Sequence, residues 1–333
     1  MKIFLSLLSF VFLWNVQLMA QPKSSFKGFV EIETGRSLFV DYTAPREGQP
    51  TLIVLNGLTY STWNNETFVL PLKKQGVGIL LFDPMGMGRT LLRYAPVQAV
   101  IPFMDQVRDL KLLLDVLEFK GPQNFAGLSY GGGLGIAFAS QYPNMVKNVV
   151  MMAPFTQPLE GQDKMVKDYI AASRSLWPFN QMSEEELYTY FFRNVVYSTY
   201  PLSEPIVLEN PFKLEAVMHM ALGGRYFNAK SLAHLVPKKS LHLVVARQDQ
   251  YIPVETLDSF WKVVPESAKA SRLYVNGSEH KLVEAVPRFM ASWVYKVLQG
   301  DKNLYKNIDF EGYPFLNKIT RDGNTLFKGD DLP

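Results

Sequence analysis

The chain has 333 residues, 47% of them hydrophobic and 13% aromatic, which is enough for one large α/β domain or two smaller ones with a sizeable buried core. Its 34 Lys and Arg residues nearly balance 31 Asp and Glu residues, so no excess of positive charge favours nucleic acid or an anionic membrane surface as a partner. Cysteine is absent, which excludes disulfides, thiolate metal sites and thiol nucleophiles.

Residues 1–20 have the layout of a secretory signal peptide. Lys2 precedes the apolar run Ile3 to Val16, a small residue stands at Ala20, and the sequence then becomes polar. Leu18 occupies a place where cleavage prefers a small residue, which weakens the assignment of the cleavage point. The alternative is an uncleaved anchor, because residues 3–20 are just long enough to approach a spanning helix. We expect an exported protein, periplasmic or secreted, that is cleaved near Ala20 and has no integral membrane segment in its mature form.

Residues 21–154 alternate strand and helix patterns. Residues 28–42 alternate apolar and polar side chains around a Thr-Gly turn, which predicts a hairpin at a sheet edge. Short apolar runs typical of strands buried on both faces follow, with helical patterns between them. The runs are residues 52–55, 78–82, 124–127 and 146–152, and the helical patterns include residues 104–119 and 133–140. This order predicts the first part of a parallel sheet with helices on both faces.

The strand pattern breaks at residues 155–237, which we predict to be an inserted helical cap. Its rings either line an apolar acyl pocket or only pack the cap; they are Trp177, Phe179, Tyr188, Tyr190, Phe191, Phe192, Tyr197 and Tyr200. Residues 238–300 resume the sheet pattern and form the second part of the core. The tail, residues 301–333, shows no clear period and is expected to be surface packing or partial disorder.

The segment Gly127-Leu128-Ser129-Tyr130-Gly131 lies where a predicted strand ends and a predicted helix begins. A serine in this context stands on a tight turn that pushes its hydroxyl into solvent. We expect the flanking glycines to allow the backbone angles of this turn and to avoid collisions with the neighbouring strand and helix. The alternative is a simple turn or a phosphate loop, but no complete phosphate-binding motif is present. Ser129 is therefore the candidate nucleophile.

A serine nucleophile needs a base, and the chain has four histidines. His280 follows the last predicted strand, at the carboxyl edge of the sheet where active sites of such folds lie. His242 begins a buried strand at the opposite edge, and His219 and His234 fall in the predicted cap. We expect His280 to be the base; the alternative is a histidine of an ordinary surface loop.

A carboxylate should accept the second ring N–H of the base and fix its tautomer. Asp249 ends the strand pattern before His280, which gives the chain order Ser, Asp, His. Asp258 is a weaker candidate because it belongs to the following helix. The alternative role for Asp249 is a helix cap before Pro253.

Two backbone N–H groups should stabilise the negative charge that develops on an attacked carbonyl. Tyr130, directly after the nucleophile, is one expected donor. The other is Leu58, in the loop Asn56-Gly57-Leu58-Thr59 that follows the strand at residues 52–55.

Taken together, these residues resemble the α/β-hydrolase superfamily from about residue 28 to residue 298. Residues 82–90 look like the Asp-x-x-Gly-x-Gly-x-Ser/Thr turn of the family, and residues 284–289 resemble its final helix. The resemblance implies an eight-stranded, mostly parallel sheet, a helical cap, and nucleophilic catalysis without a cofactor or a metal. Asn56 departs from the His-Gly pair of many members, which changes the hydrogen bonding that holds this loop.

We therefore expect hydrolysis of a carboxylic ester, in the manner of an esterase or lipase, on a small molecule with an apolar acyl group. Other reactions of the same fold stay open: a peptidase, an amidase, a carbon-carbon hydrolase or a cofactor-free haloperoxidase. A second class of function is a non-catalytic protein that uses the same fold to bind a ligand.

Overall fold

The computed structural model describes residues 24–58, 60–157, 170–179, 181–183, 186–187 and 212–328. The predicted signal peptide lies outside these residues, as do the cap aromatics Tyr188, Tyr190, Phe191, Phe192, Tyr197 and Tyr200. Within the described ranges, no helix combines the length and the apolar character needed to cross a bilayer.

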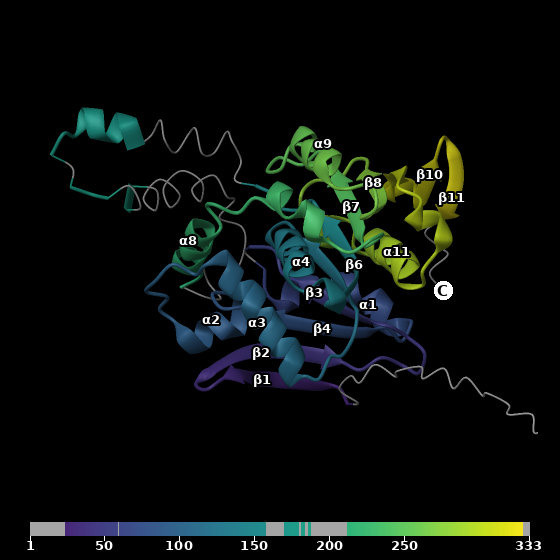
Figure 1. Cartoon of the computed structure of the whole chain (residues 1–333), viewed down its shortest axis with the longest axis horizontal. Coiled ribbons are helices and arrows are strands. Elements are labelled where there is room, and N and C mark those ends of the chain that lie inside the picture. Colours follow the sequence, from purple (N-terminus) through teal and green to yellow (C-terminus); the bar gives the residue numbers. More distant parts are fainter. Residues whose placement is uncertain are drawn as a thin grey trace, which may run out of the picture.

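A single mixed sheet runs through the described chain (Figure 1). Its spatial order is β1-β2-β4-β3-β5-β6-β7-β8-β9-β10-β11. The strands are β1 (Phe26–Glu33), β2 (Arg36–Thr43), β3 (Thr51–Leu55), β4 (Gly78–Asp83), β5 (Gln123–Leu128), β6 (Val146–Met152), β7 (Leu241–Ala246), β8 (Lys269–Val275), β9 (Ile308–Tyr313), β10 (Lys318–Arg321) and β11 (Asn324–Lys328). Neighbours from β4 to β9 are parallel, whereas β1, β2, β10 and β11 pair antiparallel at the two ends.

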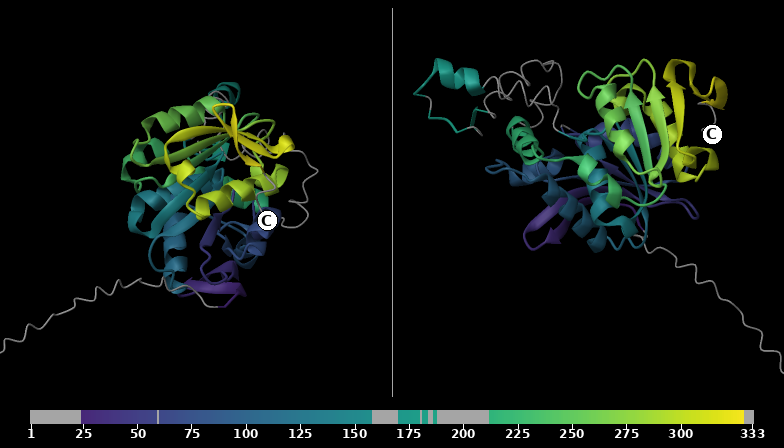
Figure 2. Two further views of the ribbon diagram at one scale, coloured as in Figure 1. Left: turned by 90° about the vertical axis from the view of Figure 1, so that its right-hand side faces the viewer. Right: turned by 45° about the horizontal axis from the view of Figure 1, so that its top comes forward.

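Helices cover both faces of this sheet (Figures 1 and 2). The α-helices are α1 (Glu66–Lys74), α2 (Gly88–Tyr94), α3 (Phe103–Val116), α4 (Tyr130–Gln141), α8 (Lys213–Gly223), α9 (Val254–Val263), α10 (Leu282–Ala285) and α11 (Pro287–Leu298). Short 3₁₀ turns are η1 (Thr62–Asn65), η2 (Pro143–Met145), η4 (Ala229–Ser231), η5 (Ala233–Leu235), η6 (Lys302–Tyr305) and η7 (Pro314–Leu316). Helices α3, α4 and α9 pack on one face, and α1, α10 and α11 pack on the other.

The sequence pattern of the central strands explains this layering. Every residue of β3, β4, β5 and β7 is buried, as expected for continuous apolar runs covered on both faces. Strand β1 instead alternates between partly buried and exposed residues, which fits its place at the edge of the sheet. The predicted α/β fold and its edge hairpin are confirmed.

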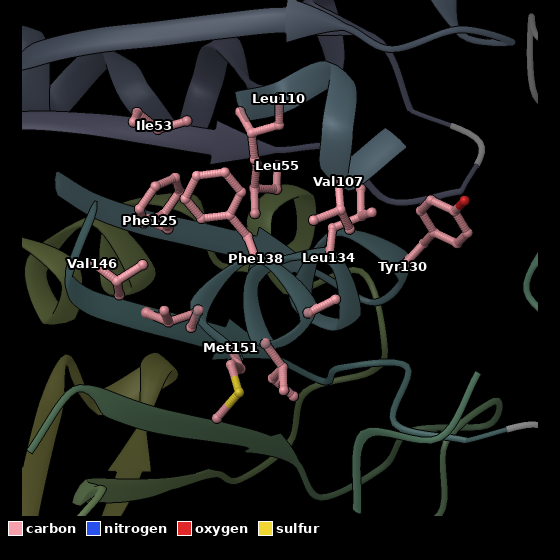
Figure 3. Packing of buried hydrophobic residues seen from close by; sticks show 14 of the residues in the cluster. Ile53, Leu55, Val107, Leu110, Phe125, Tyr130, Leu134, Phe138, Val146 and Met151 are labelled. Carbon is pink, nitrogen blue, oxygen red and sulfur yellow. The ribbon is translucent and has the colours of Figure 1, made fainter. Parts of the chain in front are cut away.

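Helix α4 sits in the centre of the larger apolar cluster (Figure 3). Phe138 on α4 contacts Phe125 on β5 with ring centroids 5.1 Å apart, and Leu134 packs beside Val107 of α3. Because the strand before α4 and the helix itself are both held in this core, the turn that joins them has little freedom to move.

The expected number of eight strands is wrong, because the sheet has eleven strands in the described residues. The additional strands β9, β10 and β11 come from the tail, residues 301–333, which the sequence predicted as surface packing or partial disorder. Their apolar side chains Phe310 and Ile319 are buried in the cluster under α11. The ring centroids of Phe310 and Trp293 lie 5.3 Å apart, so this extension is part of the folded core.

The sequence pattern predicts one last helix over residues 282–298, but this segment is divided into α10 and α11. Pro287 begins α11, and a proline at this position lacks the N–H that would continue α10.

The predicted cap, residues 155–237, is described only in part. Its described residues hold helical residues 170–176 and 186–187, α8, η4 and η5 and no strand. The domain boundaries stay a prediction.

Candidate active site

Ser129 stands where β5 ends and α4 begins. Its backbone has φ 52° and ψ −116°, a region that residues other than glycine rarely adopt. The surrounding chain fixes this strained turn, because the Ser129 N–H donates to the carbonyl of Met152 and its carbonyl accepts from the N–H of Phe155, both at 2.9 Å. Leu128 and Tyr130 are buried on either side, whereas Ser129 itself is half-buried. The turn thus lifts the serine out of the core.

The flanking glycines allow three elements to meet at this turn. A Cβ atom on Gly127 would lie 2.4 Å from the carbonyl carbon of Gly131, and one on Gly131 would lie 2.1 Å from the carbonyl oxygen of Leu55 on β3. The predicted need for glycine is confirmed as a need for close approach. The expectation that the glycines supply the unusual backbone angles is wrong, because the positive φ belongs to Ser129 itself.

Asp249 and His280 form a hydrogen-bonded pair. Nδ1 of His280 lies 2.7 Å from Oδ2 of Asp249, and the Asp249 side chain is fully buried while that of His280 is 12% exposed. The other carboxylate oxygen accepts the N–H groups of Tyr251 and Ile252, both at 2.8 Å. Because these hydrogen bonds fix the orientation of the carboxylate, Asp249 can hold the imidazole and stabilise its charged form. The alternative role of Asp249, a cap of the next helix, does not apply, because the N-cap of α9 is Pro253.

The loop that carries His280 crosses the carboxyl edge of the sheet. His280 follows β8, yet α10, which begins two residues later, packs against η1 in the segment after β3. Nδ2 of Asn64 on η1 donates to Glu284 on α10 at 3.4 Å. In the sheet order β3-β5-β6-β7-β8, the path from β8 to the β3 side passes the end of β5, where Ser129 stands. Ser129, Asp249 and His280 therefore share one edge of the sheet.

The other candidates lie elsewhere. His242 is completely buried in β7, where its Nδ1 lies 2.7 Å from Oγ of Ser271, and burial lowers its pKa to about 3. His219 lies on α8 and His234 on η5. The carboxylate of Asp258 accepts hydrogen bonds from the side chains of Arg272 and Tyr274 and is therefore not the partner of His280.

Leu58 and Tyr130 lie at adjacent strand ends, after β3 and β5. Tyr130 is the first residue of α4, and the N–H groups of a first helical turn have no acceptor within the helix. Leu58 belongs to a turn at Gly57, and a Cβ on Gly57 would lie 3.6 Å from the carbonyl oxygen of Leu128. The two candidate N–H donors thus come from touching loops, and Thr59 lies outside the described residues.

Asn56 fastens the loop of Leu58 to the sheet. Its Nδ2 donates to the carbonyl of Phe82 at 2.9 Å, and its Oδ1 accepts from Nδ2 of Asn65 at 2.8 Å. Asn56 is 1% exposed, so both ends of its amide are satisfied within the protein. This departure from the common His-Gly pair keeps the loop hydrogen-bonded by a different side chain.

Asp83 joins the same loop to the turn after β4. Its carboxylate accepts the N–H of Thr62 at 2.7 Å and the N–H of Arg89 at 2.9 Å, while its carbonyl accepts the hydroxyl of Thr90 at 2.6 Å. Burial raises the pKa of Asp83 to about 6, and the two backbone N–H groups oppose this rise. Sequence reasoning placed residues 82–90 in a family turn without giving Asp83 this structural task.

Sequence reasoning also missed Tyr251. Its ring packs edge-on against the His280 ring, with centroids 5.2 Å apart, and covers one side of the imidazole. The signal available in the sequence was its position two residues after Asp249.

Concerning metals, the described part of the chain contains no group of three or more His, Asp and Glu side chains that is arranged to hold an ion.

Three solved structures of similar fold are distant from this chain in sequence. An α/β hydrolase from a Medee basin deep-sea metagenome library superposes with a TM-score of 0.61 at 16% identity, covering 84% of this chain and 98% of that one. A membrane phospholipase A described as a bacterial virulence factor gives 0.60 at 16%, covering 84% and 88%. An enol-lactonase from Burkholderia xenovorans LB400 gives 0.57 at 15%, covering 81% and 99%. At this identity the likeness establishes the fold alone.

A family model supplies the classification. The model described as serine aminopeptidase, S33, matches residues 46–284 and so spans β3 to α10, including every predicted site residue. The matched region is well over half of the chain. The chain therefore belongs to this family and is a hydrolase with the α/β-hydrolase fold.

Proposed function

We propose that this hydrolase is exported and cleaves a carboxylic ester of a small molecule through Ser129, His280 and Asp249. The observation that carries the proposal is a strained, half-buried serine at the same sheet edge as a hydrogen-bonded His-Asp pair. Perturbed backbone geometry of this kind persists where the surrounding structure enforces it and is concentrated at reactive sites.

Each residue has a defined role in the proposed reaction. Asp249 accepts the Nδ1–H of His280, which leaves Nε2 free to take the hydroxyl proton of Ser129 as Oγ attacks the ester carbonyl. The N–H groups of Leu58 and Tyr130 bind the oxyanion of the tetrahedral intermediate. His280 then gives its proton to the departing alkoxide, so an alcohol leaves and an acyl-enzyme remains. Water, deprotonated by His280, releases the acid and restores Ser129.

An ester substrate is supported by the fold relatives named as a phospholipase and a lactonase, both of which act on carboxylic ester bonds. The description of the matched family favours a second candidate, an aminopeptidase. The two reactions use the same residues and differ in the leaving group, an alkoxide or an amine that must be protonated by His280.

The apolar acyl group and the export of the protein belong to the same proposal. An apolar pocket is suggested by the number of aromatic residues in the predicted cap, although the described members Trp177 and Phe179 are 69% and 88% exposed. Export is suggested by residues 1–20. Fractionation of expressing cells and N-terminal sequencing test export, and a cytosolic chain that keeps Met1 would contradict it.

Turnover of p-nitrophenyl esters with acyl chains of increasing length tests the reaction. We expect hydrolysis by the wild type, loss of turnover in Ser129→Ala, and a strong reduction in Asp249→Asn, which presents the wrong tautomer of His280. Aminoacyl p-nitroanilides, assayed in parallel, test the aminopeptidase. Cleavage of anilides in preference to esters would replace the ester proposal by the peptidase, and unchanged ester turnover in Ser129→Ala would reject the assigned nucleophile.

A further inference from the structure

We infer that Glu311, on β9 of the C-terminal extension (residues 301–328), is a positioning residue. It holds the loops of Asp249 and His280 in a fixed position relative to each other. The inference rests on the proposed function, because a fixed relation between these loops matters most if they carry the acid and the base. It gives residues 301–328 a task at the active-site edge.

One carboxylate binds the root of both loops, that is, the residue at which each loop leaves the sheet. Oε1 of Glu311 accepts Nη2 of Arg247 at 2.6 Å, and Oε2 accepts Nδ2 of Asn276 at 2.7 Å. Arg247 directly follows β7 and stands two residues before Asp249, while Asn276 directly follows β8 and begins the loop that ends at His280. The positions at which both loops leave the sheet are therefore tied to a single side chain.

The two loops also bond to each other, so displacement of one root reaches both. The N–H of Gln248 donates to the carbonyl of Ser278 at 3.0 Å, next to Asp249 on one side and close to His280 on the other. The N–H of Asn276 donates to the carbonyl of Gly312 on β9 at 2.9 Å. Loss of the Glu311 carboxylate would remove one of the hydrogen bonds that tie Asn276 to the extension and leave those from Asn276 to the carbonyl of Gly312.

Glu311 is itself on a rigid support. Strand β9 pairs with β8 on one side and with β10 on the other, opposite Tyr274 and Thr320. The preceding residue, Phe310, is 1% exposed and packs under α11. A carboxylate held in this way can fix loop geometry to a fraction of an ångström, which is what a proton relay requires.

The same contacts contribute little to overall stability. The side chains of Arg247 and Glu311 are 39% and 37% exposed, and ion pairs this accessible to water are worth little. Removal of Glu311 should therefore change geometry more than it changes folding.

Asp309 provides a matched control on the same strand. It stands two residues before Glu311 and makes the same kind of bridge from β9 to the sheet, binding Nε and Nη2 of Arg272 at 2.9 and 2.6 Å. Arg272 lies within β8, and its side chain also binds Asp258 on α9. Asp309→Ala thus removes an ion pair of the extension without releasing the roots of the loops.

The test compares Glu311→Ala, Glu311→Gln and Asp309→Ala in the full chain. With the ester that the wild type turns over best, Glu311→Ala should lower kcat roughly tenfold and leave KM unchanged, because the loss of Glu311 misplaces the base, whereas Glu311 itself does not touch substrate. Glu311→Gln keeps an acceptor for Asn276 but turns its amide N–H groups toward Arg247, so it should recover part of the loss. Asp309→Ala should retain the wild-type kcat at a melting temperature similar to that of Glu311→Ala.

A second measurement does not depend on turnover. In histidine-labelled protein, the Nδ1 proton shared by His280 and Asp249 should give a downfield proton resonance, assigned through its absence in Asp249→Ala. Glu311→Ala should accelerate its exchange with solvent, and Asp309→Ala should not. If the wild type hydrolyses no ester, the proposed function fails while this measurement still decides the role of Glu311.

Equal loss of kcat in Glu311→Ala and Asp309→Ala would overturn the inference, because the extension would then act only through stability. Wild-type kcat and wild-type proton exchange in Glu311→Ala would also overturn it. If Glu311→Ala does not fold, Asn276→Ala releases the same root from the other side and must lower kcat with unchanged KM for the inference to stand.

Discussion

Gly131→Ala is the substitution for which the structure predicts the sharpest loss of activity. The new Cβ would lie 2.1 Å from the carbonyl oxygen of Leu55 and 2.8 Å from that of Asn56. Both are backbone atoms, so neither can rotate away. An ordinary carbon-oxygen contact is about 3.3 Å, so α4 and the end of β3 must separate by about 1 Å.

This displacement acts directly on the proposed oxyanion hole. Tyr130 begins α4 and Leu58 follows β3, so the separation widens the gap between their N–H groups. A misplacement of about 1 Å lowers kcat by about 100-fold where geometry limits the reaction. Overpacking also costs about 1–3 kcal/mol of stability.

Gly135→Ala is the matched control for this prediction. It lies on the same helix and gains the same helix propensity, but its Cβ meets a side-chain methyl of Val149 at 2.7 Å. We expect a kcat close to that of the wild type, measured with the same p-nitrophenyl ester, and urea unfolding reports the stability of both variants. A Gly131→Ala enzyme that is folded and has the kcat of Gly135→Ala would refute this reasoning.

Buried polar groups give three further predictions. Burial lowers the pKa of His242 from 6.5 to about 3. As pH falls from 6.5 towards 3, the unfolded chain is protonated at this residue while the folded chain is not, so the stability of the fold falls. His242→Leu should remove about 2 kcal/mol of the loss between pH 7 and pH 5 in urea unfolding, and an unchanged slope would contradict this. Burial raises the pKa of Asp83 from 3.8 to about 6, which has the opposite sign: stability is lost as pH rises through this window, by about 3 kcal/mol in all. Asp83→Asn should abolish that loss; a variant with the wild-type pH dependence would show that Asp83 is not its source. Asn56→Ala leaves the Phe82 carbonyl and the Asn65 amide without their partner and should cost about 2–4 kcal/mol with a lower kcat, whereas wild-type values of both would show that the loop does not depend on Asn56.

The central fold and the edge of the sheet that carries the site were predictable from the sequence. Apolar runs buried on both faces mark the parallel strands, and the carboxyl ends of parallel strands share one edge. Ser129, Asp249 and His280 each follow such a run, so their common edge follows from topology. The hydrogen bond between Asp249 and His280 agrees with the predicted pairing.

The C-terminal strands were not predictable because packing hides their pattern. In β9 the buried face is formed by Ile308, Phe310 and Gly312, and a glycine gives no apolar signal. The ring of Phe289 fills the missing volume, since a Cβ on Gly312 would lie 2.7 Å from its Cζ. A short strand completed by a side chain from α11 cannot be recognised from its own residues.

The hydrogen-bond partners of the oxyanion loop were also beyond the sequence. Asn56 and Asn65 meet across a turn, and Asp83 binds the N–H of Thr62 from a neighbouring strand. Contacts of this kind depend on where two loops meet in space. The sequence could identify Asn56 as a departure from a family pattern, but not the bonds that replace it.

Reaction with a fluorophosphonate, followed by peptide mass spectrometry, tests the central claim most directly. The reagent forms a bond to an activated serine and loses fluoride, so it marks the nucleophile without requiring knowledge of the substrate. We predict a single adduct on the peptide that contains Ser129, no adduct in Ser129→Ala, and slower labelling in Asp249→Asn. An adduct on another residue, or none under conditions that label a known serine hydrolase, would contradict the assignment of Ser129 as the nucleophile.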